Sequence, residues 1–276
     1  MNTRQSEIID LLQKDERVSV RRLAKHFAVS PMTIRRDMAM LEEQGFLIRT
    51  HGGGLPANKL RFLQRAFPHY SMSPQKVAIG KLAASQVQPG QTVMVDSGTT
   101  TLEVARNLPN DADITVATTS IWVAQELYGS PFHVLLFGGF IREGFPSTYG
   151  PLTEAMLKGF HVDVLFVGCD GADTTSGLYT TDLRTLGLEQ QMISIADRVV
   201  VVAESVKFGR KAFVRYATLD QIDTVVTDAG LSVEDRKNLE EHNIKILIAE
   251  TEQDMKTQSG KTSNTAAWGA AAPVED

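Results

Sequence analysis

The stretch S-P-M-T-I-R-R-D-M at residues 30–38 predicts the start of an amphipathic helix. Ser30 is a favourable N-cap, and Pro31 suits the first helical position, where its missing N–H costs nothing. Apolar side chains then recur with helical spacing at Ile34, Met38 and Leu41. One face of this helix is therefore expected to pack into a core.

The opposite face of the helix carries two arginines. Met32, Arg36 and Ala39 point away from the apolar stripe at about 100° per residue. Thr33 and Arg35 lie on the flanks of the apolar stripe. Arginines and short side chains in the first half of a helix suit the major groove of DNA. The alternative is an ordinary amphipathic surface helix whose arginines are solvated.

The neighbouring residues favour a helix-turn-helix. Residues 7–12 indicate an amphipathic first helix, and residues 18–20 a short extended piece. Residues 21–27 predict a second helix, and the turn at residues 28–30 has the length expected between the two helices of this motif. We therefore assign a helix-turn-helix to residues 20–39.

A wing is predicted after this motif. Gly45 is a helix stop signal, residues 46–49 are a strand candidate, and residues 51–54 indicate a flexible loop. Three helices followed by a hairpin make a winged helix-turn-helix domain, which we place at residues 3–58, with the wing near the DNA backbone or minor groove. The candidate DNA-binding residues are Arg21, Ser30, Met32, Thr33, Arg35, Arg36, Arg49 and His51.

Charge is distributed unevenly along the chain. The net charge is −5, but residues 1–60 hold 10 Lys and Arg against 7 Asp and Glu, whereas residues 61–276 hold 18 against 26. An acidic protein is a poor general nucleic-acid binder, but a basic head on an acidic body fits a sequence-specific regulator.

Length and composition limit the other classes. A chain of 276 residues suits a small domain plus a larger one, and 42% hydrophobic residues is enough for a core. The single cysteine, Cys169, excludes an internal disulfide and a cysteine-cluster metal site, and the six histidines show no metal-ligand spacing. No run of about 18 apolar residues suggests a membrane span. We expect no metal, no cofactor, no membrane contact and a cytoplasmic protein.

An α/β domain is expected downstream. Residues 59–75 predict a linker with a short helix near residues 60–65, and the Thr-, Ser- and Ala-rich residues 250–276 predict a disordered tail. At residues 76–249, strands alternate with helices, which is typical of a mostly parallel open sheet. The expected strands are residues 92–95, 114–117, 133–137, 162–167, 199–203, 224–227 and 245–248, and the expected helices 76–87, 101–107, 121–128, 152–159, 183–196 and 232–242.

Polar and glycine-rich turns follow five of these strands. In an open α/β sheet, ligands bind at the carboxyl ends of the strands. Glycine and hydroxyl residues at a helix start offer N–H and O–H donors to an anion, and a lysine adds charge. We therefore expect a small, hydroxylated and phosphorylated molecule to bind there. The candidate effector-binding residues are Asp96, Ser97, Gly98, Thr99, Thr100, Thr119, Ser120, Gly139, Asp170 and Lys207.

Several of these residues also have a structural explanation. Thr119 and Ser120 suit the N-cap of a helix, and the glycine pair at 138–139 suits a plain turn. Asp170 fits an ordinary loop, and Lys207 a solvated surface charge. Their coincidence at one edge of the sheet favours binding. No Walker A pattern occurs, which argues against that kind of nucleoside triphosphate site.

Two sets of motifs resemble the DeoR family of bacterial transcriptional regulators. The first set is S-P-M-T-I-R-R-D within residues 20–39 and E-x-x-G-x-x-x-R-x-H-G-G at residues 42–53. The second set is D-S-G-T-T at residues 96–100, G-G at 138–139, D-G at 170–171, G-L-Y-T-T-D at 177–182 and S-V-K-F-G at 205–209. The resemblance covers about residues 3–249 and omits the tail.

The resemblance implies a repressor whose C-terminal domain is related in fold to sugar-phosphate isomerases, binds a phosphorylated sugar and assembles as a homo-oligomer, either a dimer or a tetramer. The chain departs from the family pattern at Glu204, where the family usually has Asp. It also departs at residues 118–120, which replace T-N-S, and at residues 187–191, where many members carry a Glu and a Lys/Arg pair. These differences leave the identity of the effector open.

The sequence therefore predicts a regulator that binds double-stranded operator DNA of a carbohydrate catabolic operon, as a repressor relieved by a phosphorylated sugar. The sequence does not separate repressor from activator.

The alternative to a regulator is an enzyme, either a sugar-phosphate isomerase or a sugar kinase. D-S-G-T-T is similar to the first phosphate loop of actin-like sugar kinases, but a second loop is missing. Asp96 or Asp170 could act as an isomerase base, but catalysis leaves the DNA-reading head unexplained. We expect no catalytic residue.

Overall fold

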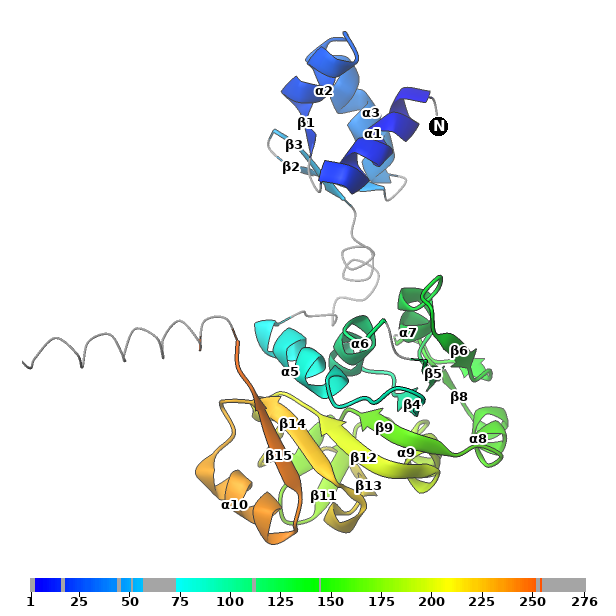
Figure 1. Ribbon diagram of the computed structural model, residues 1–276, viewed down its shortest axis with the longest axis vertical. Coiled ribbons are helices and arrows are strands. Elements are labelled where there is room, and N and C mark those ends of the chain that lie inside the picture. Colours follow the sequence, from blue (N-terminus) through cyan, green and yellow to red (C-terminus); the bar gives the residue numbers. More distant parts are fainter. Residues whose placement is uncertain are drawn as a thin grey trace, which may run out of the picture. The chain divides into compact units, whose positions relative to one another are not determined.

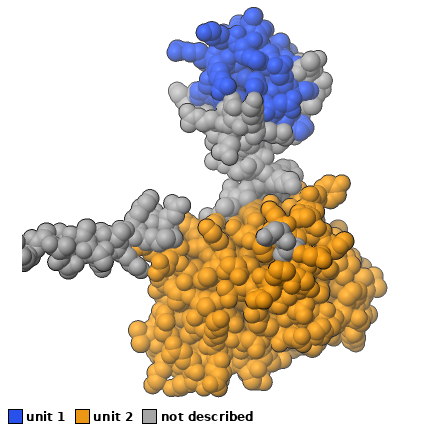
Figure 2. Space-filling view, viewed as in Figure 1, with its two compact units in different colours: residues 1–71 blue, residues 72–276 orange. Residues whose placement is uncertain are grey.

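The computed structural model describes residues 3–15, 18–43, 46–50, 52–56, 73–110, 113–143, 145–251 and 254. The chain divides into two units, residues 1–71 and residues 72–276 (Figure 2). The linker helix expected near residues 60–65 and most of the tail expected at residues 250–276 lie outside the described residues.

The first unit packs helices against a small antiparallel sheet. Its elements are α1 (Thr3–Asp15), β1 (Val18–Ser19), α2 (Val20–His26), α3 (Pro31–Glu43), β2 (Leu47–Thr50) and β3 (Gly53–Pro56) (Figure 1). The strands pair in the order β1-β3-β2. This is the winged helix-turn-helix that the sequence predicts.

The core of the first unit is built on the predicted apolar stripe of α3. Ile34, Met38 and Leu41 are fully buried and pack in one cluster with residues of α1 and α2. The turn between α2 and α3 runs through Ala28, whose φ of 54° is left-handed. This conformation ends α2 and reverses the chain before Ser30.

The glycine-rich stretch that we expected to be a flexible loop is partly a strand. Gly53 and Gly54 belong to β3 and pair with Ser19 and Val18 of β1. A Cβ atom on Gly53 would lie 1.9 Å from the carbonyl oxygen of Val18. The glycine is therefore required by a close approach of two backbones, a contact between segments that local propensity does not reveal.

The second unit is built on a seven-stranded sheet. Its strands are β4 (Thr92–Val95), β5 (Thr115–Thr118), β6 (His133–Leu136), β9 (Val162–Val167), β12 (Ala196–Val202), β14 (Thr224–Asp228) and β15 (Lys245–Ala249). They run parallel in the order β15-β14-β12-β9-β4-β5-β6. The predicted open parallel sheet is confirmed, with strand ends that differ from the expected ones by a few residues.

Helices cover both faces of this sheet. They are α5 (Pro74–Ala84), α6 (Thr99–Arg106), α7 (Ile121–Glu126), α8 (Pro151–Leu157), α9 (Leu186–Ser194) and α10 (Val233–Glu241). Leu165 and Val167 of β9 share a core cluster with α9, whereas the alternate residues Val164 and Phe166 are buried on the opposite face. The helices α5 and α6 lie together above the sheet in Figure 1.

Short antiparallel strands were not expected from the sequence. The strands β10 (Gly171–Asp173), β11 (Gly177–Thr180) and β13 (Val214–Ala217) form a second sheet, and β7 (Phe140–Ile141) pairs with β8 (Thr148–Tyr149). Each has four residues or fewer and lies between turn residues. Such segments are too short to show a period of two in the sequence.

Candidate functional site

The predicted recognition helix has its predicted cap and its predicted exposed face. The Ser30 hydroxyl accepts a hydrogen bond from the Thr33 N–H at 3.1 Å. Met32 is 69% exposed, and Arg35 and Arg36 are exposed beside it. Arg21 of α2 is exposed as well. Together these side chains present cations on the outer surface of the helix-turn-helix.

These three arginines take no part in the polar contacts that hold the described residues of the first unit together. Arg21, Arg35 and Arg36 make no hydrogen bond or ion pair with any residue that the structure describes. The adjacent Asp37 behaves differently: it is buried and accepts hydrogen bonds from Arg4 at 2.6 Å and Gln5 at 3.3 Å. The carboxylate of the R-R-D motif therefore anchors α3 to α1, while both arginines remain available for a ligand.

The wing is tied to the end of α3 by one carboxylate. Glu42 accepts hydrogen bonds from the backbone N–H of Arg49 at 3.0 Å and from its guanidinium at 2.8 Å. The Arg49 side chain is 47% exposed, so it reaches the surface while paired. The other predicted wing residue, His51, lies outside the described residues.

In the second unit, the strand order creates a topological switch point between β4 and β9. From β4 the chain continues to β5 and β6 on one side and then returns to β9 on the other side. Ligands of open α/β sheets bind at the carboxyl ends of the strands beside such a point. Asp96 directly follows β4, and residues 168–170 directly follow β9, so two predicted turns meet here.

Asp96 joins these two turns. Its carboxylate accepts hydrogen bonds from the N–H of Ser97 at 2.6 Å and from the N–H of Gly168 at 3.4 Å. Burial raises the pKa of Asp96, while these hydrogen bonds and the charge of Arg142 act in the opposite direction. On the β9 side, the hydroxyl of Tyr216 donates to the carbonyl oxygen of Gly168 at 2.5 Å.

The start of α6 offers unoccupied donors. Gly98 is its N-cap, and no side chain caps the helix. Because the first N–H groups of a helix have no intrahelical acceptor, they are available to an anion. The hydroxyls of Thr99 and Thr100 are half-buried and bond to no described residue. The Thr101 hydroxyl donates to the Asp96 carbonyl oxygen at 2.7 Å and holds the turn in place.

Asp170 and Lys207 lie in the turns that follow β9 and β12. The Asp170 carboxylate accepts hydrogen bonds from the N–H of Thr181 at 2.8 Å and from its hydroxyl at 2.6 Å. Lys207 is half-buried in the short helix η1 (Ser205–Lys207) and forms no ion pair with a described residue. Its charge acts on the half-buried thiol of Cys169, which places Lys207 near the turn after β9.

Structural roles account for two of the predicted effector residues. The Ser120 hydroxyl caps α7 by accepting from the N–H of Val123 at 3.2 Å. A Cβ atom on Gly139 would lie 2.0 Å from the hydroxyl oxygen of Thr153 on α8. A glycine at this position therefore allows α8 to pack close to the turn. The Thr119 hydroxyl is different, since it is buried and has no hydrogen-bond partner among the described residues.

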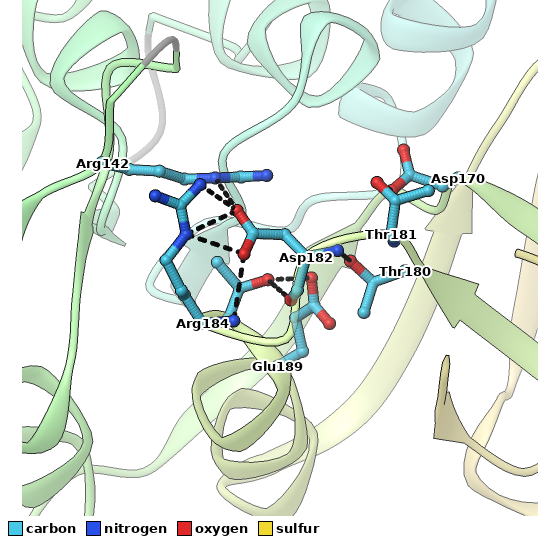
Figure 3. A network of polar contacts seen from close by, with 8 residues as sticks. Arg142, Asp170, Thr180, Thr181, Asp182, Arg184 and Glu189 are labelled. Atoms are coloured by element: carbon cyan, nitrogen blue, oxygen red, sulfur yellow. Dashed lines mark hydrogen bonds and ion pairs between the residues drawn. The ribbon is translucent and has the colours of Figure 1, made fainter. Parts of the chain in front are cut away.

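A charged network at the same edge of the sheet was missed in the sequence. Figure 3 shows Arg142 and Arg184 converging on Asp182, with Glu189 below them. The Asp182 carboxylate accepts from the Nε of Arg142 at 2.8 Å, from the Nε of Arg184 at 2.9 Å and from its Nη2 at 2.7 Å. Hydrogen bonds from Arg184 hold the pKa of Asp182 far below its ordinary value. The motif G-L-Y-T-T-D contained Asp182, but nothing in the sequence marked Arg142 as its partner.

Glu189, on α9, is the least satisfied member of this network. Its Oε1 accepts from the Thr185 hydroxyl at 3.1 Å, whereas its Oε2 is buried and has no hydrogen-bond partner among the described residues. Burial, followed by the charge of Asp96, raises the pKa of Glu189 to about 8. The carboxyl is therefore mostly protonated at neutral pH.

The arrangement suits binding of a polar anion. Donors at the α6 start and Lys207 can take a phosphate, and the carboxyls of Asp96, Asp170 and Glu189 can take hydroxyl groups. Burial raises the pKa of Cys169 to about 12, so its thiol is not a nucleophile at neutral pH. Among the described residues, no group of three or more His, Cys, Asp or Glu could hold a metal ion.

Family models match both units. A model described as a DeoR-like helix-turn-helix domain matches residues 4–58, and a model described as the DeoR C terminal sensor domain matches residues 71–229. None of the described helices is long and apolar enough to span a bilayer.

Curated relatives align over nearly their whole length. The chain is 34% identical to the HTH-type transcriptional regulator GlpR of Haloferax volcanii over 88% of this chain and 96% of that protein. It is 31% identical to the glycerol-3-phosphate regulon repressor of Escherichia coli over 89% of this chain and 98% of that protein. Among solved structures, ribose 5-phosphate isomerase A of Methanocaldococcus jannaschii aligns at 18% identity and a TM-score of 0.37, over 48% of this chain and 53% of that chain.

Proposed function

Because the chain belongs to the DeoR family and is a DNA-binding transcriptional regulator, we propose that it represses a carbohydrate catabolic operon until a phosphorylated sugar binds its second unit. The observation that carries the effector half is the meeting of the Asp96 and Gly168–Asp170 turns at the switch point. The name of the Escherichia coli relative, a glycerol-3-phosphate regulon repressor, supports a phosphorylated polyol or sugar. The relatives named above are regulators or repressors, which supports regulation over an isomerase or kinase activity.

In the first unit, α3 would read the operator. Arg35 and Arg36 would hydrogen-bond base edges or phosphates, because they are exposed and unpaired among the described residues. Ser30, Met32 and Thr33 would fix the helix start in the major groove. Arg21 would contact the phosphate backbone, and the wing would do so through Arg49 and His51.

In the second unit, the effector would lie across the carboxyl ends of β4, β9 and β12. Its phosphate would take donors from residues 97–100 at the start of α6 and the charge of Lys207. Asp96, Asp170 and Thr119 would hydrogen-bond its hydroxyl groups, and Ser120 and Gly139 would shape the adjoining turns.

One ion pair offers a route from this site toward the linker. Glu204, which precedes the Lys207 turn, accepts a hydrogen bond from the Ser73 hydroxyl at 2.5 Å and pairs with Lys76 at 3.4 Å. Ser73 and Lys76 stand at the start of α5, the first described element after the first unit. A shift of the Lys207 turn on binding would therefore act on the point where the chain leaves for the DNA-binding unit.

We propose that the chain assembles as a dimer or tetramer and that it is located in the cytoplasm. Helix-turn-helix proteins commonly bind two half-sites as dimers, which a twofold-symmetric assembly of this chain would match. Operator DNA is reached in the cytoplasm. Whether such a regulator represses or activates depends on where its operator lies. Activation is therefore the alternative outcome of the experiments on DNA.

The DNA half is tested by a gel shift on the DNA upstream of the adjacent genes. Arg35→Ala/Arg36→Ala is expected to weaken binding on the order of 10- to 100-fold and to lower the salt slope by about 1 to 2. Arg236→Ala/Lys237→Ala, which removes the same charge from exposed positions of α10, is the control. Unchanged affinity and salt slope in the α3 variant would contradict its assignment as the recognition helix.

The effector half is tested by calorimetry with a panel of pentose 5-phosphates and hexose 6-phosphates. Lys207→Ala is expected to lose on the order of 10-fold or more in affinity for the panel member that binds best. Lys211→Ala is the control, because Lys211 is exposed and pairs only distantly with Asp173, at 3.7 Å. Turnover of a bound sugar phosphate would favour the enzyme alternative instead.

A further inference from the structure

Arg142 places a mostly buried cation at the carboxyl edge with most of its donors unused. Its side chain is 18% exposed, and only its Nε donates a hydrogen bond, to Asp182. The two terminal nitrogens bond to none of the residues that the structure describes. A guanidinium has five N–H donors in a fixed fork, so four of those of Arg142 have no acceptor among the described residues and can serve a ligand.

Asp182 orients Arg142 but does not depend on it. The carboxylate is already held by Arg184 through the backbone N–H at 3.0 Å as well as through two guanidinium nitrogens. Figure 3 shows the Arg142 side chain above this pair, with its end directed toward the side where Asp170 and Thr181 lie. The network therefore fixes a guanidinium whose remaining donors face the ends of the strands.

Glu189 brings a complementary acceptor to the same place. Its buried Oε2 has no hydrogen-bond partner in the described part of the chain. A buried carboxyl oxygen without a partner costs free energy unless a ligand or a water completes it. Glu189 interacts electrostatically with both Asp96 and Arg142, so the three groups lie near one another at the switch point.

The charges around Arg142 favour a neutral polar group over a second phosphate. Asp96 and Asp182 are carboxyls close to its guanidinium, and their negative charge would repel another dianion. The N–H donors of Arg142 match the oxygen of a hydroxyl or carbonyl group, and the acceptor on Glu189 matches the O–H of a hydroxyl group.

We propose that Arg142 and Glu189 recognise the hydroxyl and carbonyl groups of the effector at the end remote from its phosphate, and so determine which sugar phosphate is bound. This inference rests on the effector function proposed above. It assigns the two residues a role in sugar specificity, and it leaves the phosphate to the start of α6 and Lys207.

The test compares two probes, inorganic phosphate and the best-binding sugar phosphate of the panel, on the full chain by calorimetry. Two variants, Arg142→Gln and Glu189→Met, should each weaken sugar-phosphate binding on the order of 10- to 100-fold. Glu189→Met keeps the length of the side chain but removes the acceptor. Binding of inorganic phosphate should change by less than about threefold, whereas Lys207→Ala should weaken both probes.

Arg215→Gln is the control, because Arg215 is exposed, donates to the carbonyl oxygen of Ser176 at 3.2 Å and lies outside the Asp182 network. It should change neither affinity by more than about threefold. Thermal unfolding of each variant, together with Arg142→Lys as a milder change, separates lost recognition from lost folding.

Three results would overturn the inference. One is unchanged sugar-phosphate affinity in both folded variants, and another is an equal loss for sugar phosphate and inorganic phosphate. The third is a wild-type protein that binds phosphate but no panel member more tightly. A wild-type protein that binds neither probe would instead contradict the proposed function itself, and the inference with it.

Discussion

Glu189 makes the stability of the second unit depend on pH. Its carboxyl has an ordinary pKa of 4.5, and burial beside Asp96 raises that pKa to about 8 in the folded chain. Between these values the folded chain binds more protons than the unfolded chain, so the free energy of unfolding falls as pH rises. The stabilisation from this group is complete below about pH 4.5 and is lost as pH rises through about 8.

We therefore expect Glu189→Gln to gain stability relative to the wild type as pH rises. The difference in free energy of unfolding should grow by roughly 1–3 kcal/mol between about pH 5 and 8.5, less than the full shift implies because solvent reaches part of the side chain. Urea denaturation across this range, followed by tryptophan fluorescence, measures it. Glu241→Gln, an exposed change in α10, is the control, and a difference that stays constant with pH would contradict the expectation.

Side-chain exposure was predictable where it follows helical periodicity, and partners distant in sequence were not. The spacing of Ile34, Met38 and Leu41 placed Arg35 and Arg36 on the outer face, as the structure shows. The burial of Asp37 depends on Arg4, which is 33 residues away, and the role of Arg142 depends on Asp182, which is 40 residues away. Contacts of that kind are set by the tertiary fold and leave no local pattern.

The wing is the element whose geometry is most sensitive to one atom. Gly53→Ala would place a Cβ atom 1.9 Å from the Val18 carbonyl oxygen, so β1 and β3 would have to separate. We expect a loss of at least about 2 kcal/mol in local stability and weaker operator binding, because the wing would no longer be seated.

Hydrogen exchange of the amides in β1 and β3, together with the gel shift, measures both effects. Gly52→Ala is a control from the adjacent position, since nothing lies within 4 Å of its Cβ position. Equal protection of the two strands in both variants would show that the wing adjusts without cost.

The central strands of the second unit could be predicted because most of their residues are buried, on both faces of the sheet. A strand such as β12, with its run of four valines at residues 199–202, shows a continuous apolar pattern in the sequence. The loop after β12 and the turn after β4 were also recognisable as polar breaks. The short strands β10 and β11 were not, because they have only three and four residues, and the strand β13 that completes their sheet by pairing with β11 lies more than 30 residues downstream.

At the scale of the whole molecule, regulation requires the effector site to change how the first unit binds DNA. The helix α5 is suited to this role, since it follows the first unit directly and packs tightly against α6. A Cβ atom on Gly80 of α5 would lie 2.4 Å from the Cβ of Glu103 on α6. The start of α5 also contacts Glu204, which precedes the Lys207 turn. The helix α5 therefore contacts both α6 and the Lys207 segment, the two parts of the chain proposed to bind phosphate.

Glu204→Gln should uncouple the two activities while leaving each of them in place. The amide can still accept from Ser73, but it loses the charge that Lys76 pairs with at 3.4 Å. Operator affinity and sugar-phosphate affinity, measured separately, should each change by less than about threefold. Saturating sugar phosphate lowers operator affinity by a coupling factor, which is typically about 5- to 150-fold for coupled sites. This factor should fall several-fold in the variant.

Asp197→Asn, which removes an exposed pair with His161 from the same unit, is the control. A coupling factor equal to that of the wild type would exclude Glu204 from the route, because its charge would then have no part in passing the signal to α5.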